Sequence, residues 1–205
     1  MHIVFDFDHT LFNTAQLWQD WLDQLENCGI DRADAVESGE RLFGIGFSPY
    51  NHGDQLGLQG DELDQLVSDF EEYTRQESEQ LLYKDVEECI KKWGDEHTFS
   101  ILTFGHAEYQ HSKIEAAGLN DLIDDVRIAM PERTKATQIA EMLKEIDEPI
   151  MFVDDNPREL QAVAELGLDV QLVRMRRKGG RHSDEFCKED GEKWQSITSL
   201  SDMTI

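Results

Sequence analysis

The sequence predicts an α/β fold, in which a parallel sheet carries helices on both faces and a small all-helical cap is added. Short apolar runs with β-branched residues recur along the chain, and helical patterns lie between most of them. One long segment near the N-terminus interrupts this alternation with helical patterns alone. The 205 residues, 39% of them hydrophobic, suffice for one core domain with an insert.

The predicted strands are the apolar runs at residues 2–5, 99–102, 126–129, 150–153 and 170–173. Helices are predicted between them at 87–93 and at 106–117, where Gly118 ends the second one. Two further helices are predicted from apolar residues at helical spacing, one around 136–143 and one around 160–164. The chain is less regular after residue 174, with a last short strand or helical turn at 197–200. Strands that alternate with helices in this way form a parallel sheet buried on both faces.

The segment from 14 to 82 contains no convincing strand and is predicted to be the helical cap. It holds two amphipathic stripes, Leu17, Trp18, Trp21, Leu22 and Leu25 in one and Leu63, Leu66, Val67, Phe70 and Tyr73 in the other. A glycine-rich stretch at 44–60 separates them. Because the insert follows the first strand directly, we expect it to cover the end of that strand. Residues 1–13 and 83–205 are the expected core domain, and the two tryptophans are expected in the interior of the cap.

Composition and charge exclude several classes of protein. The formal charge of −25 disfavours nonspecific nucleic-acid binding and indicates a solvated acidic surface. No apolar stretch approaches the roughly 20 residues of a membrane span, and the N-terminus lacks a secretory pattern. Cys28, Cys89 and Cys187 are isolated, which argues against disulfides and a cysteine zinc site. A cytoplasmic protein with reduced thiols is expected, and its oligomeric state is left open.

One basic cluster stands out in this acidic chain, at residues 174–181. Charge runs of this kind are usually solvated, so a surface loop is the favoured interpretation. A contact for an anion is the alternative.

Polar side chains follow three of the predicted strands, where ligand sites of parallel sheets form. They are Asp6 and Asp8 after the first run, Thr103, Phe104 and Gly105 at the second, and Asp154 and Asp155 at the fourth. Carboxylates brought to one place repel each other unless a cation lies between them, and Mg²⁺ suits oxygen ligands best. If the chain turns between Asp6 and Asp8, one can stay ionised beside a metal while the other has a raised pKa and carries a proton.

Four segments together resemble the motifs of the haloacid dehalogenase-like hydrolase superfamily, whose core is Rossmann-like. DFDHT at 6–10 is similar to the first motif, and ILTFG at 101–105 to the second. Lys135 stands where the third motif has its lysine, and FVDD at 152–155 is similar to the fourth. All four occur in the family's order between residue 1 and about residue 174.

The resemblance implies a catalytic role for four residues, which are Asp6, Asp8, Thr103 and Lys135. Asp6 would be the nucleophile and form an aspartyl-phosphate. Asp8 would protonate the leaving alkoxide and then deprotonate the water that hydrolyses the intermediate. The implied phosphate-binding set is Thr103, Phe104, Gly105 and Lys135. Phosphoryl transfer depends on positioned groups that neutralise the phosphate oxygens, which agrees with this assignment.

The same resemblance implies a Mg²⁺ site. The ion would be held by Asp6, by the backbone carbonyl of Asp8 and by Asp155, with Asp154 beside it. Many relatives have Gly-Asp in the fourth motif, so the division of roles between Asp154 and Asp155 stays open. Asn156 is expected to shape the turn before Pro157.

Lys113 is the alternative to Lys135 for the lysine of the third motif. It falls within a predicted helix, and we expect it on the surface. Lys135 is therefore the preferred residue.

The expected activity is hydrolysis of a small phosphorylated metabolite by a phosphatase of this family. Members that cleave carbon–halogen bonds lack the second aspartate, so Asp8 favours phosphate esters. A sugar phosphomutase of the same family, or a catalytically weak binding or regulatory protein, is the alternative. The sequence does not identify the substrate.

Overall fold

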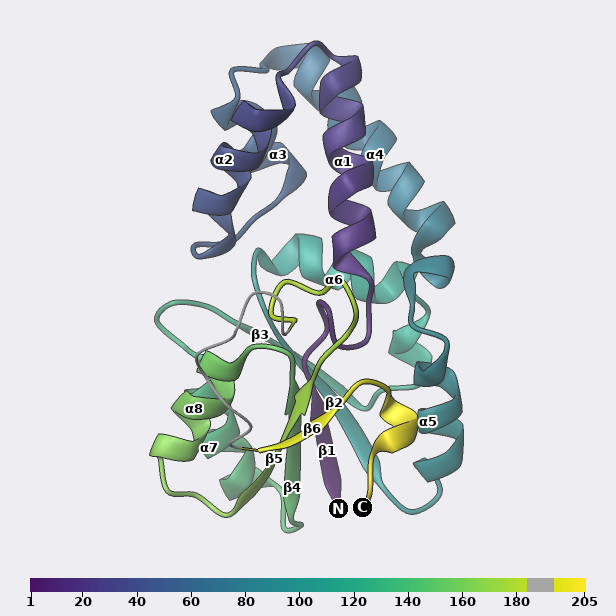
Figure 1. The fold of residues 1–205 in the computed structure, drawn as a ribbon, viewed down its shortest axis with the longest axis vertical. Helices are drawn as coiled ribbons and strands as arrows, with labels where there is room; N and C mark the ends of the chain where they lie inside the picture. Colours follow the sequence, from purple (N-terminus) through teal and green to yellow (C-terminus); the bar gives the residue numbers. More distant parts are fainter. Residues whose placement is uncertain (184–193) are drawn as a thin grey trace.

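A six-stranded, fully parallel sheet forms the centre of the molecule and confirms the predicted α/β class (Figure 1). The computed structural model describes residues 1–183 and 194–205, so Cys187 lies outside the described residues. The strand order is β3-β2-β1-β4-β5-β6. The bounds are β1 His2–Phe5, β2 Thr98–Phe104, β3 Asp125–Ala129, β4 Ile150–Asp154, β5 Val170–Met175 and β6 Gln195–Ile197.

Strand β1 lies in the middle of the sheet, where the chain order changes direction. Phe5 is opposite Ile101 of β2 on one side and Val153 of β4 on the other. The later strands β3 and β5 add outward from these neighbours. In open parallel sheets such a reversal point is the usual place for a ligand, at the carboxyl ends of the strands.

Helices cover both faces of the sheet, because neighbouring residues of β1 point to opposite sides. Ile3 and Phe5 belong to one apolar core and Val4 to the other. The first core receives α5 (Asp85–Trp93), α6 (Ala107–Ala116), η1 (Leu119–Asp121) and η2 (Leu200–Asp202). The second receives α7 (Lys135–Glu145) and α8 (Pro157–Glu165), which lie on the left of the sheet in Figure 1.

Four helices form the upper part of the molecule in Figure 1, above the carboxyl edge of the sheet. They are α1 (Thr14–Asn27), α2 (Arg32–Phe43), α3 (Pro49–Gln55) and α4 (Gly60–Leu81). The amphipathic stripes predict α1 and α4, whereas α2 and α3 were not predicted. Helix α2 starts at the Asp31 cap with a charged sequence, and α3 starts at Ser48 and Pro49 within the glycine-rich stretch.

The interior of this helical segment is built around Trp21 and His52. Trp21 is buried, and its Nε1 donates to Nδ1 of His52 at 2.9 Å. His52 Nε2 lies 3.0 Å from the carbonyl oxygen of Ala35, so the imidazole is fully satisfied. Trp18 differs from Trp21, because it is only half-buried and faces the cavity described below.

The helical segment enters and leaves the core at one place. The Asn13 N–H donates to the carbonyl of Leu81 at 2.8 Å, and the Tyr83 N–H donates to Leu11 at 3.0 Å. The two crossing chains are therefore hydrogen-bonded to each other. Within the described residues, no helix combines the length and apolar character needed to cross a bilayer.

Candidate active site

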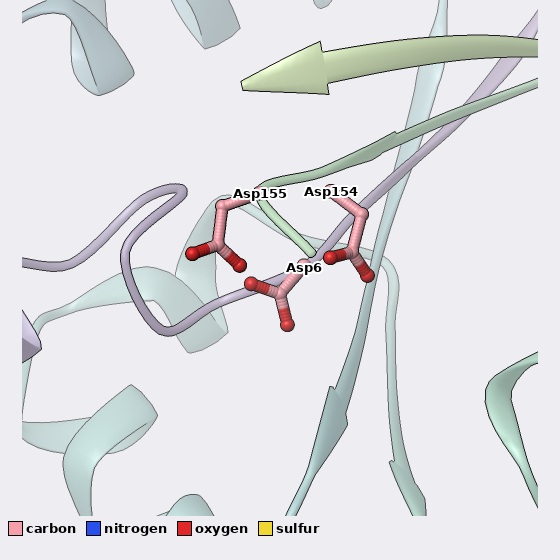
Figure 2. A group of neighbouring side chains, drawn as sticks. All are labelled: Asp6, Asp154 and Asp155. Carbon is pink, nitrogen blue, oxygen red and sulfur yellow. The ribbon is translucent and has the colours of Figure 1, made fainter. Parts of the chain in front are cut away.

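Three aspartates converge at the carboxyl edge of the sheet (Figure 2). Asp6 follows β1 directly, and Asp154 and Asp155 stand at the end of β4. The two strands are parallel neighbours, and the Asp6 N–H donates to the Val153 carbonyl at 2.8 Å, so their ends coincide. All three residues are buried, and one carboxylate oxygen from each lies within 4.8 Å of the others.

Lys135 binds two of these carboxylates. It is the first residue of α7, and its Nζ donates to Asp6 Oδ1 at 2.6 Å and to Asp154 Oδ2 at 2.7 Å. Asp154 Oδ1 also accepts from the Asn156 N–H at 2.7 Å. Both oxygens of Asp154 are thus engaged, whereas Asp155 Oδ2 is buried without a hydrogen-bond partner.

The crowding of negative charge is visible in the pKa values. Burial raises the pKa of Asp6 to about 7, against the opposing effect of Lys135, and Asp154 adds to the rise. Burial, Asp6 and Asp154 also raise the pKa of Asp155 well above its usual value. A hard divalent cation would relieve this repulsion and give the orphan oxygen of Asp155 a partner. The donor set therefore fits such an ion.

Asp8 lies at the same site but has a different set of partners. It accepts hydrogen bonds from Lys113 Nζ at 2.5 Å, from Thr14 Oγ1 at 2.5 Å and from Gln110 Nε2 at 2.7 Å. Burial alone would raise the pKa of Asp8, but Lys113 and the hydrogen bonds together outweigh burial and lower the pKa to about 2. Of the two aspartates, Asp6 therefore has the raised pKa, although the family resemblance implies that Asp8 carries the proton.

Lys113 is not on the surface, so that prediction was wrong. Its side chain is 3% exposed, and it lies on the inner face of α6 with Gln110 and Ile114. Gln110, Lys113 and Ile114 stand at positions i, i+3 and i+4, so they share one face of a helix. Counting Lys113 as a buried residue would have predicted this face from the sequence. Both lysines therefore belong to the site: Lys135 binds Asp6 and Asp154, and Lys113 binds Asp8.

The predicted phosphate-binding residues lie at the end of β2. Thr103 is buried, and its Oγ1 has no hydrogen-bond partner. Gly105 has a φ of 148°, and a Cβ there would come within 2.8 Å of Gln110 Nε2, so the position requires glycine. The Gly105 N–H donates to Ala129 and the Phe104 carbonyl accepts from Gln110, so both backbone groups are already bonded. Thr103 is the member of this set with a free donor.

A cavity of 590 Å³ opens above these residues. Asp6, Asp8, Thr103, Lys135 and Asp155 all line it. Asp154 does not, which agrees with its engaged oxygens. Asn156 accepts from the Arg158 N–H at 3.0 Å and caps α8, in line with the expected turn.

The helical segment supplies the opposite wall of the cavity through Trp18, Phe43 and Phe47. The ring centroid of Phe47 lies 6.0 Å from that of Tyr109 on α6. Arg181, from the loop after β5, also lines the cavity. Sequence patterns did not indicate these residues as site residues, since aromatic stripes predict an interior and charge runs a solvated loop.

The sequence matches the model of a known protein family over most of its length. The family model of haloacid dehalogenase-like hydrolases matches residues 3–173. The chain belongs to this family. The four motifs that carried the resemblance are those that converge at the site. No curated protein matches the sequence.

Solved structures of the family share the fold. A haloacid dehalogenase-like hydrolase from Burkholderia xenovorans matches with a TM-score of 0.79 at 19% identity, covering 98% of this chain and 93% of the other. A predicted phosphoglycolate phosphatase from Haemophilus somnus matches with a TM-score of 0.63 at 16% identity, covering 98% and 94%. An L-2-haloacid dehalogenase from Xanthobacter autotrophicus, with chloropropionic acid covalently bound, matches with 0.60 at 17%, covering 98% and 95%. These proteins include both a phosphatase and a dehalogenase, so the shared fold does not select the reaction.

Proposed function

We propose that this hydrolase is a Mg²⁺-dependent phosphatase that cleaves a small phosphate monoester through an aspartyl-phosphate on Asp6. One observation carries the proposal. Two carboxylates with different partners, Asp6 and Asp8, line one cavity together with the unpartnered hydroxyl of Thr103. A nucleophile, a proton carrier and a phosphate-oxygen donor are the groups that this reaction needs.

In the first half-reaction Asp6 attacks the phosphorus atom. Lys135 occupies Oδ1, which leaves Oδ2 to form the new P–O bond. The ester P–O bond breaks, and Asp8 gives a proton to the leaving alkoxide. Thr103 donates to a phosphate oxygen, and Lys135 balances the negative charge that collects on the nucleophile.

In the second half-reaction water attacks the aspartyl-phosphate. Asp8 takes a proton from this water, the bond to Asp6 breaks, and phosphate leaves. This step starts from the ionised form of Asp8 that Lys113 stabilises. The first step needs the protonated form, which the ion pair with Lys113 disfavours.

Asp6, Asp155 and the backbone carbonyl of Asp8 are the groups that would hold Mg²⁺. Bound there, the ion neutralises oxygens of the phosphoryl group and of the acidic cluster. Asp154 would position Lys135, because both of its oxygens are already bonded. In this proposal Asp155 is the metal ligand and Asp154 positions the lysine, a division that the sequence left open.

We further propose that residues 14–82 act as a cap on a core of residues 1–13 and 83–205, and that the protein works in the cytoplasm. The adjoining entry and exit of the helical segment would let it move as a unit over the cavity. Free thiols at Cys28, which is exposed, and at Cys89 suit a reducing compartment.

Phosphate release tests the reaction directly. We expect phenyl phosphate and a panel of phosphorylated metabolites to release phosphate with Mg²⁺, and excess chelator to stop the release. Asp6→Asn should abolish turnover, and Asp64→Asn, an exposed aspartate of α4, should not. Phosphate release that persists in Asp6→Asn would refute the nucleophile.

Two further assays separate the alternatives. Chloride release from 2-chloropropionate, without phosphatase activity, would favour dehalogenation, which needs no proton for the leaving halide. Isomerised sugar phosphate without free phosphate would favour a phosphomutase. Inactivity in all three assays would favour a binding protein.

A further inference from the structure

The structure points to a second anion site at the wall of the cavity. This inference rests on the function proposed above. We infer that the substrate carries, besides the scissile phosphate, a second anionic group that binds Arg181. That group is a carboxylate or a second phosphate. The body of the substrate then lies against the aromatic rings of the helical segment.

Arg181 differs from the other cations of the cavity. Lys113 pairs with Asp8, and Lys135 pairs with Asp6 and Asp154. Among residues 1–183 and 194–205, no carboxylate lies within ion-pairing distance of Arg181. It lies in a loop of a chain with a formal charge of −25, where carboxylates are abundant. An unpaired arginine in a substrate cavity of such a protein suits an anionic ligand.

The Arg181 side chain is placed by an aromatic ring. Its guanidinium carbon lies 4.7 Å from the centroid of Phe43 on α2. Such stacking holds the planar group at the wall while its N–H donors stay available at the edge. A bidentate contact with a carboxylate or phosphate uses those donors.

His9 supplies an independent second observation. Its Nδ1 is buried without a hydrogen-bond partner, and its side chain also lines the cavity. The loop that carries Arg181 packs directly on His9, since a Cβ on Gly180 would come within 3.5 Å of His9 Cβ. In the tautomer that has its proton on Nδ1, His9 has a free N–H donor at this position. An anion oxygen near Arg181 would satisfy that imidazole.

The helical segment contributes aromatic rings to the rest of the wall, beside polar residues that include Glu40. Trp18, Phe43 and Phe47 line the cavity together with Tyr109, and each of the three cap rings is only partly buried. Partly exposed aromatic rings in a cavity gain free energy when a ligand covers them. Among the residues that the structure describes, the cavity therefore combines a catalytic floor, a group of aromatic rings and an arginine without a carboxylate partner.

A pair of esters that differ only in charge tests the inference. We compare kcat/KM for 3-carboxyphenyl phosphate and for 3-carbamoylphenyl phosphate, which has the same shape but no second charge. Wild type should prefer the carboxylate by about tenfold at low salt, the size of one charge-assisted contact that is partly exposed. The preference should reside mainly in KM, and added salt should reduce it.

Two variants locate the effect. Arg181→Gln should bring the ratio of the two kcat/KM values close to one. Lys178→Gln removes the same charge from an exposed residue of the same loop that does not line the cavity, so it should keep the wild-type ratio. An equal loss in both variants would indicate general electrostatic attraction and overturn the site.

A third ester distinguishes the two anion chemistries. If 1,3-phenylene bisphosphate exceeds the carboxylate in its dependence on Arg181, the site favours a second phosphate, and the reverse result favours a carboxylate. Hydrolysis of all esters at equal rates in wild type would overturn the inference while leaving the phosphatase intact. Hydrolysis of none of them would overturn the proposed function itself.

Discussion

Two buried lysines each form ion pairs with carboxylates near the end of β1. The resulting two clusters, one around Lys135 and one around Lys113, differ in their balance of charge. Lys135 lies among three carboxylates, those of Asp6, Asp154 and Asp155. Lys113 lies against the single carboxylate of Asp8, which also accepts from two neutral donors. The first cluster thus keeps excess negative charge, and the second is neutral.

The difference shows which cluster needs a partner from outside the chain. Around Lys113 one cation faces one carboxylate, which also accepts from Thr14 and Gln110, and the pKa of Asp8 falls to about 2. Around Lys135 the carboxylates outnumber the cation, and the pKa of Asp6 rises to about 7. A cluster whose charges balance can be stable without a ligand, whereas one with more buried carboxylates than cations is suited to bind a cation.

Of the variants that compare the two clusters, Asp8→Asn should have the largest effect. Without the proton carrier, hydrolysis of an alkyl phosphate should fall by about 10²–10⁴-fold. Hydrolysis of p-nitrophenyl phosphate should fall less in its first step, because that leaving group needs little protonation. Steady-state rates and mass spectrometry of the quenched enzyme measure this, with a phosphoryl adduct expected on the variant. Equal losses on both esters, with no adduct, would contradict the role of Asp8.

Lys135→Met should cost the most stability. Removing the cation breaks its ion pairs with Asp6 and Asp154, which should lower the free energy of unfolding by about 3 kcal/mol in chelator. Excess Mg²⁺ should restore part of this loss, since the ion supplies positive charge to the same carboxylates. Urea unfolding with chelator and with Mg²⁺ measures both effects. A variant as stable as wild type in chelator would show that the cluster is not strained by its charge.

Much of this arrangement was predictable because strand ends of a parallel sheet coincide. Once the runs ending near Phe5, Leu102 and Val153 are taken as neighbouring strands, their next polar residues must meet at one edge. The family motifs then assign those residues. Period-2 and period-3.6 patterns carry this information, so the fold class and the convergence of Asp6 and Asp155 followed from the sequence.

The elements that could not be predicted from the sequence have no regular spacing of apolar residues. Helix α2 is too polar to show a clear stripe, and α3 lies among glycines. The arginines of the basic cluster at 174–181 differ in their surroundings. Arg177 is buried, and its Nη1 donates to Asp85 Oδ2 at 2.7 Å, whereas Arg181 lines the cavity. A loop has no regular alternation that would reveal which of its arginines points inward.

Lys113→Met should have a smaller effect than Lys135→Met. Asp8 keeps two neutral donors, and its side chain is 22% exposed, so about 1–2 kcal/mol of stability should be lost. Mg²⁺ should not restore it selectively, because the missing charge lies at the neutral cluster. Lys178→Met, an exposed lysine, is the control. Selective rescue of Lys113→Met by Mg²⁺ would contradict the separation of the two clusters.

The smallest expected effect is the dependence of this loss on pH. The pKa of Asp8 is about 2 in the folded protein and 3.8 as its ordinary value, so its contribution to stability is present above pH 3.8 and is lost as the pH falls through 2. Between pH 6 and pH 3 the unfolded chain takes up more protons at Asp8 than the folded one, which costs wild type about 1 kcal/mol. Lys113→Met lacks most of this penalty, so the stability difference between the two proteins should shrink by about that amount. Contributions from Asp6 and Asp155 have the opposite sign and occur in both proteins, so they cancel in the comparison. Urea unfolding of both proteins at the two pH values measures the change, and a difference that stays constant would show that Lys113 does not set the ionisation of Asp8.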